Sequence, residues 1–289
     1  MRDYHLGRLD DRGRQALLSE GDAELPSPDR TEFLQSKHWT TAPLYKVQPL
    51  SEDTKVFRFK FNHENQVSGL PVGQHLMMRV KDKASQNDVL RAYTPISKTT
   101  DKGFLDVLVK LYLPTGDRPG GQMSMALDRL DIGDDVDFKG PIGRFEYLGR
   151  GRAMVKGEER TVKSFVMICG GSGITPIYQV FRAIMEDPSD KTTCTLLDGN
   201  RTERDILLRR ELDSLASRDQ DHCRLLYMLT DGSEGWTGLR GRISEELIRE
   251  HVAPQEGKIA LICGPPGMEA ATKAGLIKNG WRDEEILTF

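Results

Sequence analysis

Two short stretches combine residue types that suit phosphate binding. Residues 91–97, RAYTPIS, place a guanidinium at Arg91, which can face a pyrophosphate, close to the flat ring and hydroxyl of Tyr93. Residues 169–176, CGGSGITP, contain three glycines, and Pro176 suits the first position of a helix, where the N–H groups of residues 173–175 would face an anion. The simpler alternatives are an edge strand with a chance Arg and Tyr, and a plain strand-to-helix turn.

Three further motifs are rich in turn-forming residues. Residues 119–124, PGGQMS, precede a short apolar segment at residues 125–130, so paired glycines would let a phosphate approach the start of a helix. A plain Gly-Gly turn is the alternative. Residues 140–147, GPIGRFEY, are expected to close a strand-rich region. Residues 263–268, CGPPGM, follow an apolar strand, so they are expected at the same sheet edge as the first glycine loop.

The hydrophobic pattern changes along the chain. Residues 55–61 and 105–111 alternate between apolar and polar side chains, which predicts antiparallel strands and a small closed barrel. Later strands, expected at residues 164–169, 193–197, 224–229 and 258–263, alternate with helices at 177–186 and 206–216, which predicts a parallel sheet. The sequence therefore predicts a two-domain protein, with an antiparallel β-barrel domain at 41–150 and an α/β parallel-sheet nucleotide-binding domain at 164–289. A linker is expected between them at 151–163. Residues 1–40 are expected to form a polar N-terminal extension or hinge, with a helical candidate at 10–20.

The motifs RAYTPIS, GPIGRFEY, CGGSGITP and CGPPGM, taken in this order, resemble the NADH-cytochrome b5 reductase family. That family includes the C-terminal flavin fragment of assimilatory nitrate reductases. The resemblance covers about residues 41–289, and the segments DYHLGRL, FLQSKHW and GRGRAMVKGEER are most similar to the fungal nitrate reductases. An unrelated tail is the alternative for the N-terminal segment.

The resemblance implies a function as well as a fold. It implies a six-stranded antiparallel barrel that binds FAD, followed by a domain that binds NADH or NADPH. In such a protein the nicotinamide gives a hydride to the flavin, and single electrons pass to a cytochrome b5-type haem protein or domain. The cysteine matching Cys263 would lie beside the nicotinamide, and Lys110 would lie near flavin and nicotinamide. A strand-end Cys buried for packing and a solvated Lys are the alternatives.

Site residues are carried over by motif match. Lys110 and Cys263 are the residues expected nearest to the chemistry. The predicted cofactor-binding residues are Arg91, Ala92, Tyr93, Thr94, Ser97, Val109, Lys110, Tyr112, Gly120, Gly121, Gln122, Met123, Ser124, Gly171, Gly173, Thr175, Pro176, Arg201, Arg204, Asp205, Cys263, Gly264, Pro265 and Met268.

The choice of nucleotide depends on opposed charges after the second strand of the α/β domain. Asp198, which could hold ribose hydroxyls or be a solvated turn residue, and Asp205 carry carboxylates that would repel a 2'-phosphate. Arg201 and Arg204 could grip that phosphate through paired hydrogen bonds. Because such contacts outweigh repulsion through screened solvent, the sequence predicts that NADPH is used at least as well as NADH.

Bulk properties exclude several classes. A length of 289 residues favours two domains, and a net charge of -3 argues against a nucleic-acid binder. The four cysteines show neither a disulfide framework nor CxxC spacing, so we expect reduced thiols, a cytoplasmic location and no metal. Apolar runs fall short of the roughly 18 residues of a membrane span, so no membrane anchor is expected in this chain.

Two alternative functions remain open from the sequence. A free soluble NADH-cytochrome b5 reductase would carry the same motifs. A non-catalytic flavin-binding module would keep the flavin motifs without turnover. A serine hydrolase is excluded, because Ser172 lies in a phosphate-type loop without the GxSxG pattern or a suitably spaced Asp and His.

Overall fold

The computed structural model describes residues 31–117 and 119–289, which divide into two compact units, one ending at Gly143 and the other beginning at Arg144. We call them the N-terminal unit and the C-terminal unit. The helical candidate at residues 10–20 lies outside the described residues. The division falls before residue 150, where the sequence suggested that the first domain ends.

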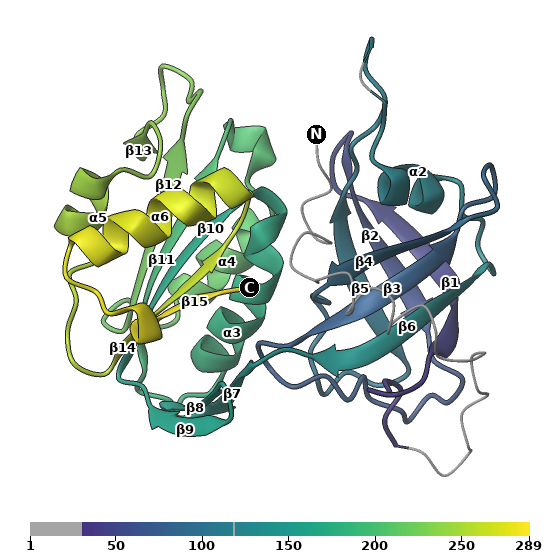
Figure 1. Ribbon diagram of the computed structural model, residues 1–289, viewed down its shortest axis with the longest axis horizontal. Helices are drawn as coiled ribbons and strands as arrows, with labels where there is room; N and C mark the ends of the chain where they lie inside the picture. Colours follow the sequence, from purple (N-terminus) through teal and green to yellow (C-terminus); the bar gives the residue numbers. More distant parts are fainter. Residues whose placement is uncertain (1–30, 118) are drawn as a thin grey trace. The chain divides into compact units, whose positions relative to one another are not determined.

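The N-terminal unit is built on a six-stranded antiparallel sheet in the order β4-β3-β6-β1-β2-β5 (Figure 1). Its edges meet, because the Ile96 N–H, which follows β4, donates to the Asp106 carbonyl of β5 at 2.8 Å. The antiparallel fold expected for this region is confirmed. The strands are β1 (Thr40–Pro49), β2 (Thr54–Lys60), β3 (His75–Lys81), β4 (Asp88–Tyr93), β5 (Phe104–Lys110) and β6 (Asp135–Ile142).

Alternate side chains of these strands fill the core, as the period-two pattern predicts. Phe59 and Phe138 pack edge to face with ring centroids 5.0 Å apart. The short helix α2 (Gln122–Asp128) adds Met123 and Leu127 to the same core. Phe33 also belongs to it, stacked on Phe61 at 4.3 Å. The segment FLQSKHW is thus part of the folded unit, although the polar composition of residues 1–40 suggested an extension.

The C-terminal unit contains a six-stranded parallel sheet in the order β13-β12-β11-β10-β14-β15, which confirms the expected α/β fold. Helices α3 and α4 pack on one face of the sheet, and α5 and α6 pack on the other (Figure 1). The elements are β10 (Ser164–Gly170), α3 (Ile174–Glu186), β11 (Thr193–Asn200), α4 (Arg209–Ala216), β12 (Cys223–Leu229), β13 (Leu239–Arg240), α5 (Glu245–His251), β14 (Lys258–Cys263), α6 (Pro266–Lys278) and β15 (Ile286–Thr288).

The stretch suggested as a linker, residues 151–163, contains two strands. Strands β7 (Phe145–Gly149), β8 (Arg152–Val155) and β9 (Glu158–Thr161) form a small antiparallel sheet within the C-terminal unit. Lys156 and Gly157 both have positive φ, of 54° and 92°, so they make the tight two-residue turn between β8 and β9. Charged residues and short strands hide the alternation there.

Candidate functional site

In the N-terminal unit, strand β4 and helix α2 bring RAYTPIS beside PGGQMS, because the two elements pack against each other. Arg91 is 5% exposed, and its Nη1 donates to the Leu90 carbonyl at 2.6 Å. Burial raises the pKa of Tyr93 well above its usual value, while the nearby Arg91 acts in the opposite direction. A buried cation and a neutral phenol therefore lie at the end of β4.

Tyr112 joins these motifs to the segment after β5. Its carbonyl accepts from the Gly121 N–H at 2.7 Å, and its own N–H donates to Ser124 Oγ at 2.9 Å. Its ring is 50% exposed, and its hydroxyl is close enough to Tyr93 to raise the pKa of that phenol further. Two aromatic rings, a guanidinium and a glycine turn thus come together from parts of the chain that are distant in sequence.

Lys110 and Ser97 have contacts that the sequence did not suggest. Lys110 Nζ lies 3.3 Å from Asp53 Oδ2 and its side chain is 17% exposed, so it is not a fully solvated residue. Ser97 Oγ accepts from the Asp106 N–H at 3.1 Å, where the edges of the sheet meet. Ser97 therefore holds the barrel together in addition to any contact with a ligand.

The arrangement fits a flavin dinucleotide. Gly121 begins α2 with extended backbone, and no side chain among the described residues caps this helix, so its first N–H groups can serve an anion. A Cβ at Gly120 would come within 2.9 Å of Met125 Sδ, and one at Gly121 within 3.2 Å of Ser124 Oγ. Arg91 and these N–H groups suit a diphosphate, and the tyrosine rings suit a planar ring system.

In the C-terminal unit, the two glycine motifs lie side by side. They follow the adjacent strands β10 and β14, in which Cys169 is the register partner of Cys263. A Cβ at Gly173 would meet the Cys263 carbonyl oxygen at 2.2 Å, and one at Gly264 would meet Met268 Cε at 2.6 Å. The expectation that both motifs share one edge of the sheet is therefore met, and glycine is required where their backbones meet.

Helix α3 begins at Ile174, two residues before Pro176, which the sequence suggested as the first residue of the helix. Gly171 adopts φ +56°, residues Gly171–Gly173 form a short 3-10 turn, and Pro176 is the third residue of α3. Pro is acceptable there because N–H groups of the first turn have no partner within the helix. The Ile174 N–H donates to the carbonyls of the 3-10 turn, so it does not point freely at an anion as the sequence suggested.

Asp198 is neither a ribose ligand nor a solvated turn residue, because it is only 1% exposed. Its carboxylate accepts from Asn200 Nδ2 at 2.8 Å and from Cys169 Sγ at 3.4 Å. Burial raises the pKa of Asp198 to about 7, and the two hydrogen bonds limit the rise. Burial also raises the pKa of the Cys169 thiol, as does the neighbouring Asp198. The Cys169 thiol is therefore protonated at neutral pH, which disfavours nucleophilic chemistry there.

Residues after β11 have different roles from those their charges suggested. Asp205 Oδ2 accepts from the Thr202 N–H at 3.0 Å and from Thr202 Oγ1 at 2.7 Å, so this carboxylate caps a 3-10 turn. Arg201 Nε donates to Asp231 Oδ2 at 2.8 Å. Arg204 is exposed. Sequence reasoning missed Asp231, because it lies 30 residues away in a loop without a recognisable motif.

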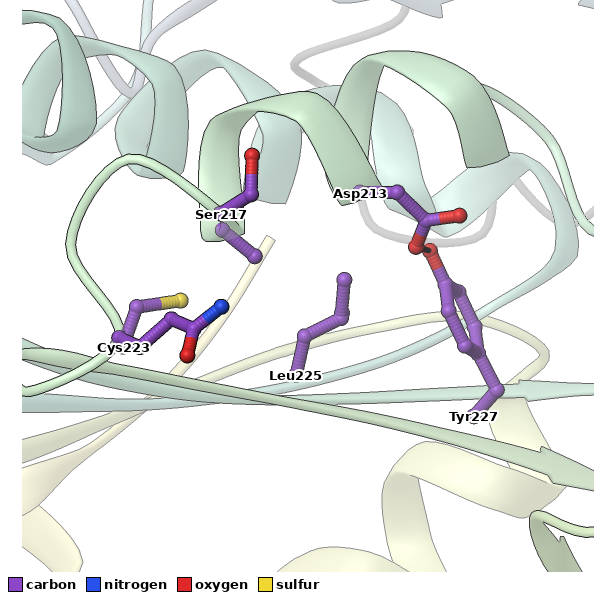
Figure 2. A pocket seen from close by; sticks show the side chains of 7 residues that line it. Asp213, Ser217, Cys223, Leu225 and Tyr227 are labelled. Carbon is purple, nitrogen blue, oxygen red and sulfur yellow. Dashed lines mark hydrogen bonds between the residues drawn. The ribbon is translucent and has the colours of Figure 1, made fainter.

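A cavity of about 290 Å³ lies between α4 and β12 (Figure 2). Asp213 and Tyr227 line one end of it, where the Tyr227 hydroxyl donates to Asp213 Oδ1 at 2.8 Å. Cys223 and Ser217 lie toward the other end. None of the predicted cofactor residues lines this cavity, so its shape says nothing about the cofactor site.

The predicted site residues differ in how far they are exposed to solvent. Tyr112, Gln122, Arg201, Arg204 and Pro265 are exposed. Partial exposure is found for Ala92, Tyr93, Lys110, Gly120, Gly121, Gly171, Asp205, Gly264 and Met268, and the buried members are Arg91, Thr94, Ser97, Val109, Met123, Ser124, Gly173, Thr175, Pro176 and Cys263. Among the described residues, no group of three or more His, Cys, Asp or Glu side chains is placed to hold a metal ion.

Comparison with known proteins agrees with this geometry. The sequence of residues 41–147 matches the family model of the oxidoreductase FAD-binding domain. Residues 167–274 match the family model of the oxidoreductase NAD-binding domain. Fold, glycine motifs and matches together define the class: an NAD(P)H-dependent flavoprotein oxidoreductase with FAD as its cofactor.

The particular family follows from a solved structure. The cytochrome b5 reductase domain of Ulva prolifera nitrate reductase is 37% identical, with a TM-score of 0.85, over 90% of this chain and 100% of that one. This chain belongs to the family of cytochrome b5 reductase domains of nitrate reductase.

Curated relatives include the NADPH nitrate reductases of Aspergillus niger, 48% identical over 100% of this chain, and Leptosphaeria maculans, 47% identical over 99%. The chain spans about a third of their length, 33% and 32% respectively. In the part of the chain that the structure describes, no helix is long and apolar enough to cross a membrane.

Proposed function

We propose that this chain takes a hydride from NADPH and passes the electrons singly to a cytochrome b5-type haem domain, as the flavin part of a nitrate reductase. FAD supplies the chemistry that turns a two-electron donor into a one-electron donor. The arrangement of the motifs carries the proposal. In the N-terminal unit, β4 and α2 bring RAYTPIS and PGGQMS together. In the C-terminal unit, the two glycine motifs lie together at one edge of the parallel sheet. The names of the relatives supply the haem acceptor and nitrate.

In the N-terminal unit, Arg91 and the first N–H groups of α2 would hold the diphosphate of FAD. Tyr93 and Tyr112 would pack against its rings, and the buried Thr94 and Val109 would exclude water. Lys110, held by Asp53, would contribute positive charge near the reacting ring. These roles require no catalytic acid or base in the protein.

In the C-terminal unit, the loop of Gly171, Gly173 and Thr175 would hold the phosphates of the nucleotide. Cys263 and Gly264, at the end of β14, would form the wall beside the nicotinamide. Because Cys263 is 7% exposed and hydride transfer needs no thiolate, its role would be to position the ring. Its replacement by Ser would slow flavin reduction without releasing FAD.

The proposed preference for NADPH rests on three observations. The relatives are named NADPH nitrate reductases. The Asp205 carboxylate accepts hydrogen bonds from Thr202, so it is occupied by a local contact. Arg201 and Arg204 are both exposed and can contact a 2'-phosphate. A free NADH-cytochrome b5 reductase is the second candidate, because its flavin and nucleotide motifs would be the same as those of a reductase domain within a nitrate reductase.

The test is anaerobic reduction of the purified protein. The account predicts a yellow protein whose flavin absorbance bleaches on addition of NADPH and returns on addition of ferricyanide or cytochrome b5. A yellow protein that neither NADPH nor NADH bleaches would favour a non-catalytic flavin-binding module. A strong preference for NADH would favour the free reductase.

A further inference from the structure

The loops after β11 and β12 are joined to each other at the carboxyl edge of the parallel sheet. The Thr230 N–H donates to the Asn200 carbonyl at 3.1 Å, and the Asp231 N–H donates to the Arg201 carbonyl at 2.8 Å. Arg201 Nε in turn donates to Asp231 Oδ2 at 2.8 Å. Dinucleotides bind outside this edge in open α/β sheets, so the pair lies where a nucleotide would meet it.

The loop that carries Asp231 is fixed by its own contacts. Arg240 donates to the carbonyls of Gly232 at 3.0 Å, Ser233 at 2.7 Å and Trp236 at 3.0 Å. Ser233 Oγ also donates to Glu203 Oε1, at 3.1 Å, in the loop after β11. The backbone of this loop therefore holds the carboxylate of Asp231 beside Arg201.

The charges around Arg201 single out Asp231. The hydrogen bond that Arg201 donates to Asp231 is the largest cause that raises the pKa of Arg201, and Asp205 contributes only through longer-range attraction. The side chains of Arg201 and Asp231 are 78% and 55% exposed. Exposed ion pairs are weak, so a stronger anion can replace the carboxylate.

We propose that Asp231 is a specificity-determining residue that competes with the ribose 2'-phosphate of NADPH for the guanidinium of Arg201. The inference rests on the proposed function and deepens it. A dianionic phosphate offers Arg201 paired, charge-assisted hydrogen bonds, whereas NADH has no group that would replace the carboxylate. Asp231 therefore lowers the affinity for NADPH more than that for NADH, and it weakens the preference for NADPH that Arg201 creates.

The experiment measures nucleotide-fragment binding as well as turnover. In Asp231→Asn, we expect the ratio of kcat/KM for NADPH to that for NADH to rise about fivefold, the size that an exposed ion pair allows. Calorimetric titration with 2',5'-ADP should show a similar fall in Kd, and titration with 5'-AMP a much smaller one. Asp219→Asn is the matched control, because it removes the same charge from the same unit at a residue paired with His222 before β12.

A double substitution tests whether Asp231 acts through Arg201. In Arg201→Ala the additional change Asp231→Asn should leave the Kd for 2',5'-ADP nearly unchanged, because the competing pair no longer exists. The inference is overturned if the gain persists without Arg201, or if Asp231→Asn behaves like Asp219→Asn. Failure of both nucleotides to reduce the flavin would contradict the proposed function instead, and the titrations with 2',5'-ADP would still decide the role of Asp231.

Discussion

Glycines occur in the phosphate-type motifs of both units, but they are required for different reasons. In the C-terminal unit, a Cβ at Gly173 would meet the backbone of Cys263 at 2.2 Å and that of Gly264 at 2.8 Å. In the N-terminal unit, a Cβ at Gly121 would meet only the side chains of Ser124 and Tyr112, at 3.2 Å and 3.5 Å. The fold alone therefore requires glycine at position 173, whereas the side chains around Gly121 can move, and we propose that a bound phosphate is the reason for glycine there.

Substitution of Gly173 is expected to cost the most stability, because its Cβ would overlap backbone atoms. Gly173→Ala forces a methyl group into the backbone of a neighbouring strand end, so we expect the C-terminal unit to lose more than about 4 kcal/mol of its free energy of unfolding. Urea unfolding followed by circular dichroism measures it. The control is Gly171→Ala, where a Cβ has nothing within 4 Å and only the positive φ of 56° is unfavourable, which costs about 1 kcal/mol. Equal losses in the two variants would contradict the assignment of Gly173.

The second prediction concerns Asp198, a buried carboxyl group of the C-terminal unit. The pKa of Asp198 is about 7 in the folded protein against an ordinary value of 3.8, so folding favours its protonated form. The stability from this group is fully present below about pH 4 and is lost as the pH rises through 7. The free energy of unfolding of Asp198→Asn, measured relative to that of the wild type, should therefore rise by about 2.5 kcal/mol as the pH increases from 5 to 8.

Measurement of this effect needs both proteins unfolded in urea at each pH. Because the variant and wild type share every other titrating group, the difference between their free energies of unfolding isolates residue 198. A difference that stays constant from pH 5 to pH 8 would show that Asp198 is ionised in the folded protein. That outcome would mean that its hydrogen bonds from Asn200 and Cys169 outweigh burial.

In the N-terminal unit the buried ionisable group at the proposed site is the guanidinium of Arg91. Arg91→Ala should weaken FAD binding by about 2 kcal/mol, or about thirtyfold in Kd, because a charge-assisted contact with the diphosphate is lost. Fluorescence of released FAD measures it at dilute protein. The matched control is Arg58→Ala, which removes a cation of the same unit that is paired with Asp106. Full retention of FAD in Arg91→Ala would rule out the assigned role.

The smallest effect tests the second half of the comparison. Gly121→Ala should change the free energy of unfolding by less than about 1 kcal/mol, because φ of -66° is ordinary for alanine and Ser124 Oγ can shift by a few tenths of an ångström. FAD affinity should fall more than stability does, since a ligand phosphate needs the space that the methyl group occupies. A loss of stability as large as that of Gly173→Ala would remove the distinction between the two units.

The sequence predicted those parts of the fold that repeat a local pattern. Alternating apolar residues indicate β2 and β5, and apolar runs followed by glycine turns indicate β10 and β14, because burial of one or both faces leaves a periodic trace. The site motifs could be placed for the same reason, since each lies at a strand end or a helix start.

Contacts between distant residues could not be predicted in this way. The burial of Phe33 depends on Phe61. Asp198 is buried in β11 between the neighbouring strands β10 and β12, so its burial does not follow from its own segment. Similarly, the pairing of Arg201 with Asp231 is set by the register of β11 and β12. A single sequence carries no record of register, so the partner of Arg201 could not be identified from charge alone.

The most direct test of the account is the stoichiometry of electron transfer under anaerobic conditions. A limiting amount of NADPH is added to the FAD-loaded protein in the presence of excess cytochrome b5, and haem reduction is followed by absorbance. Because one hydride carries two electrons and a haem accepts one, the account predicts two reduced haems for each NADPH consumed. Oxidation of NADPH without haem reduction, or the absence of any NADPH oxidation, would contradict it.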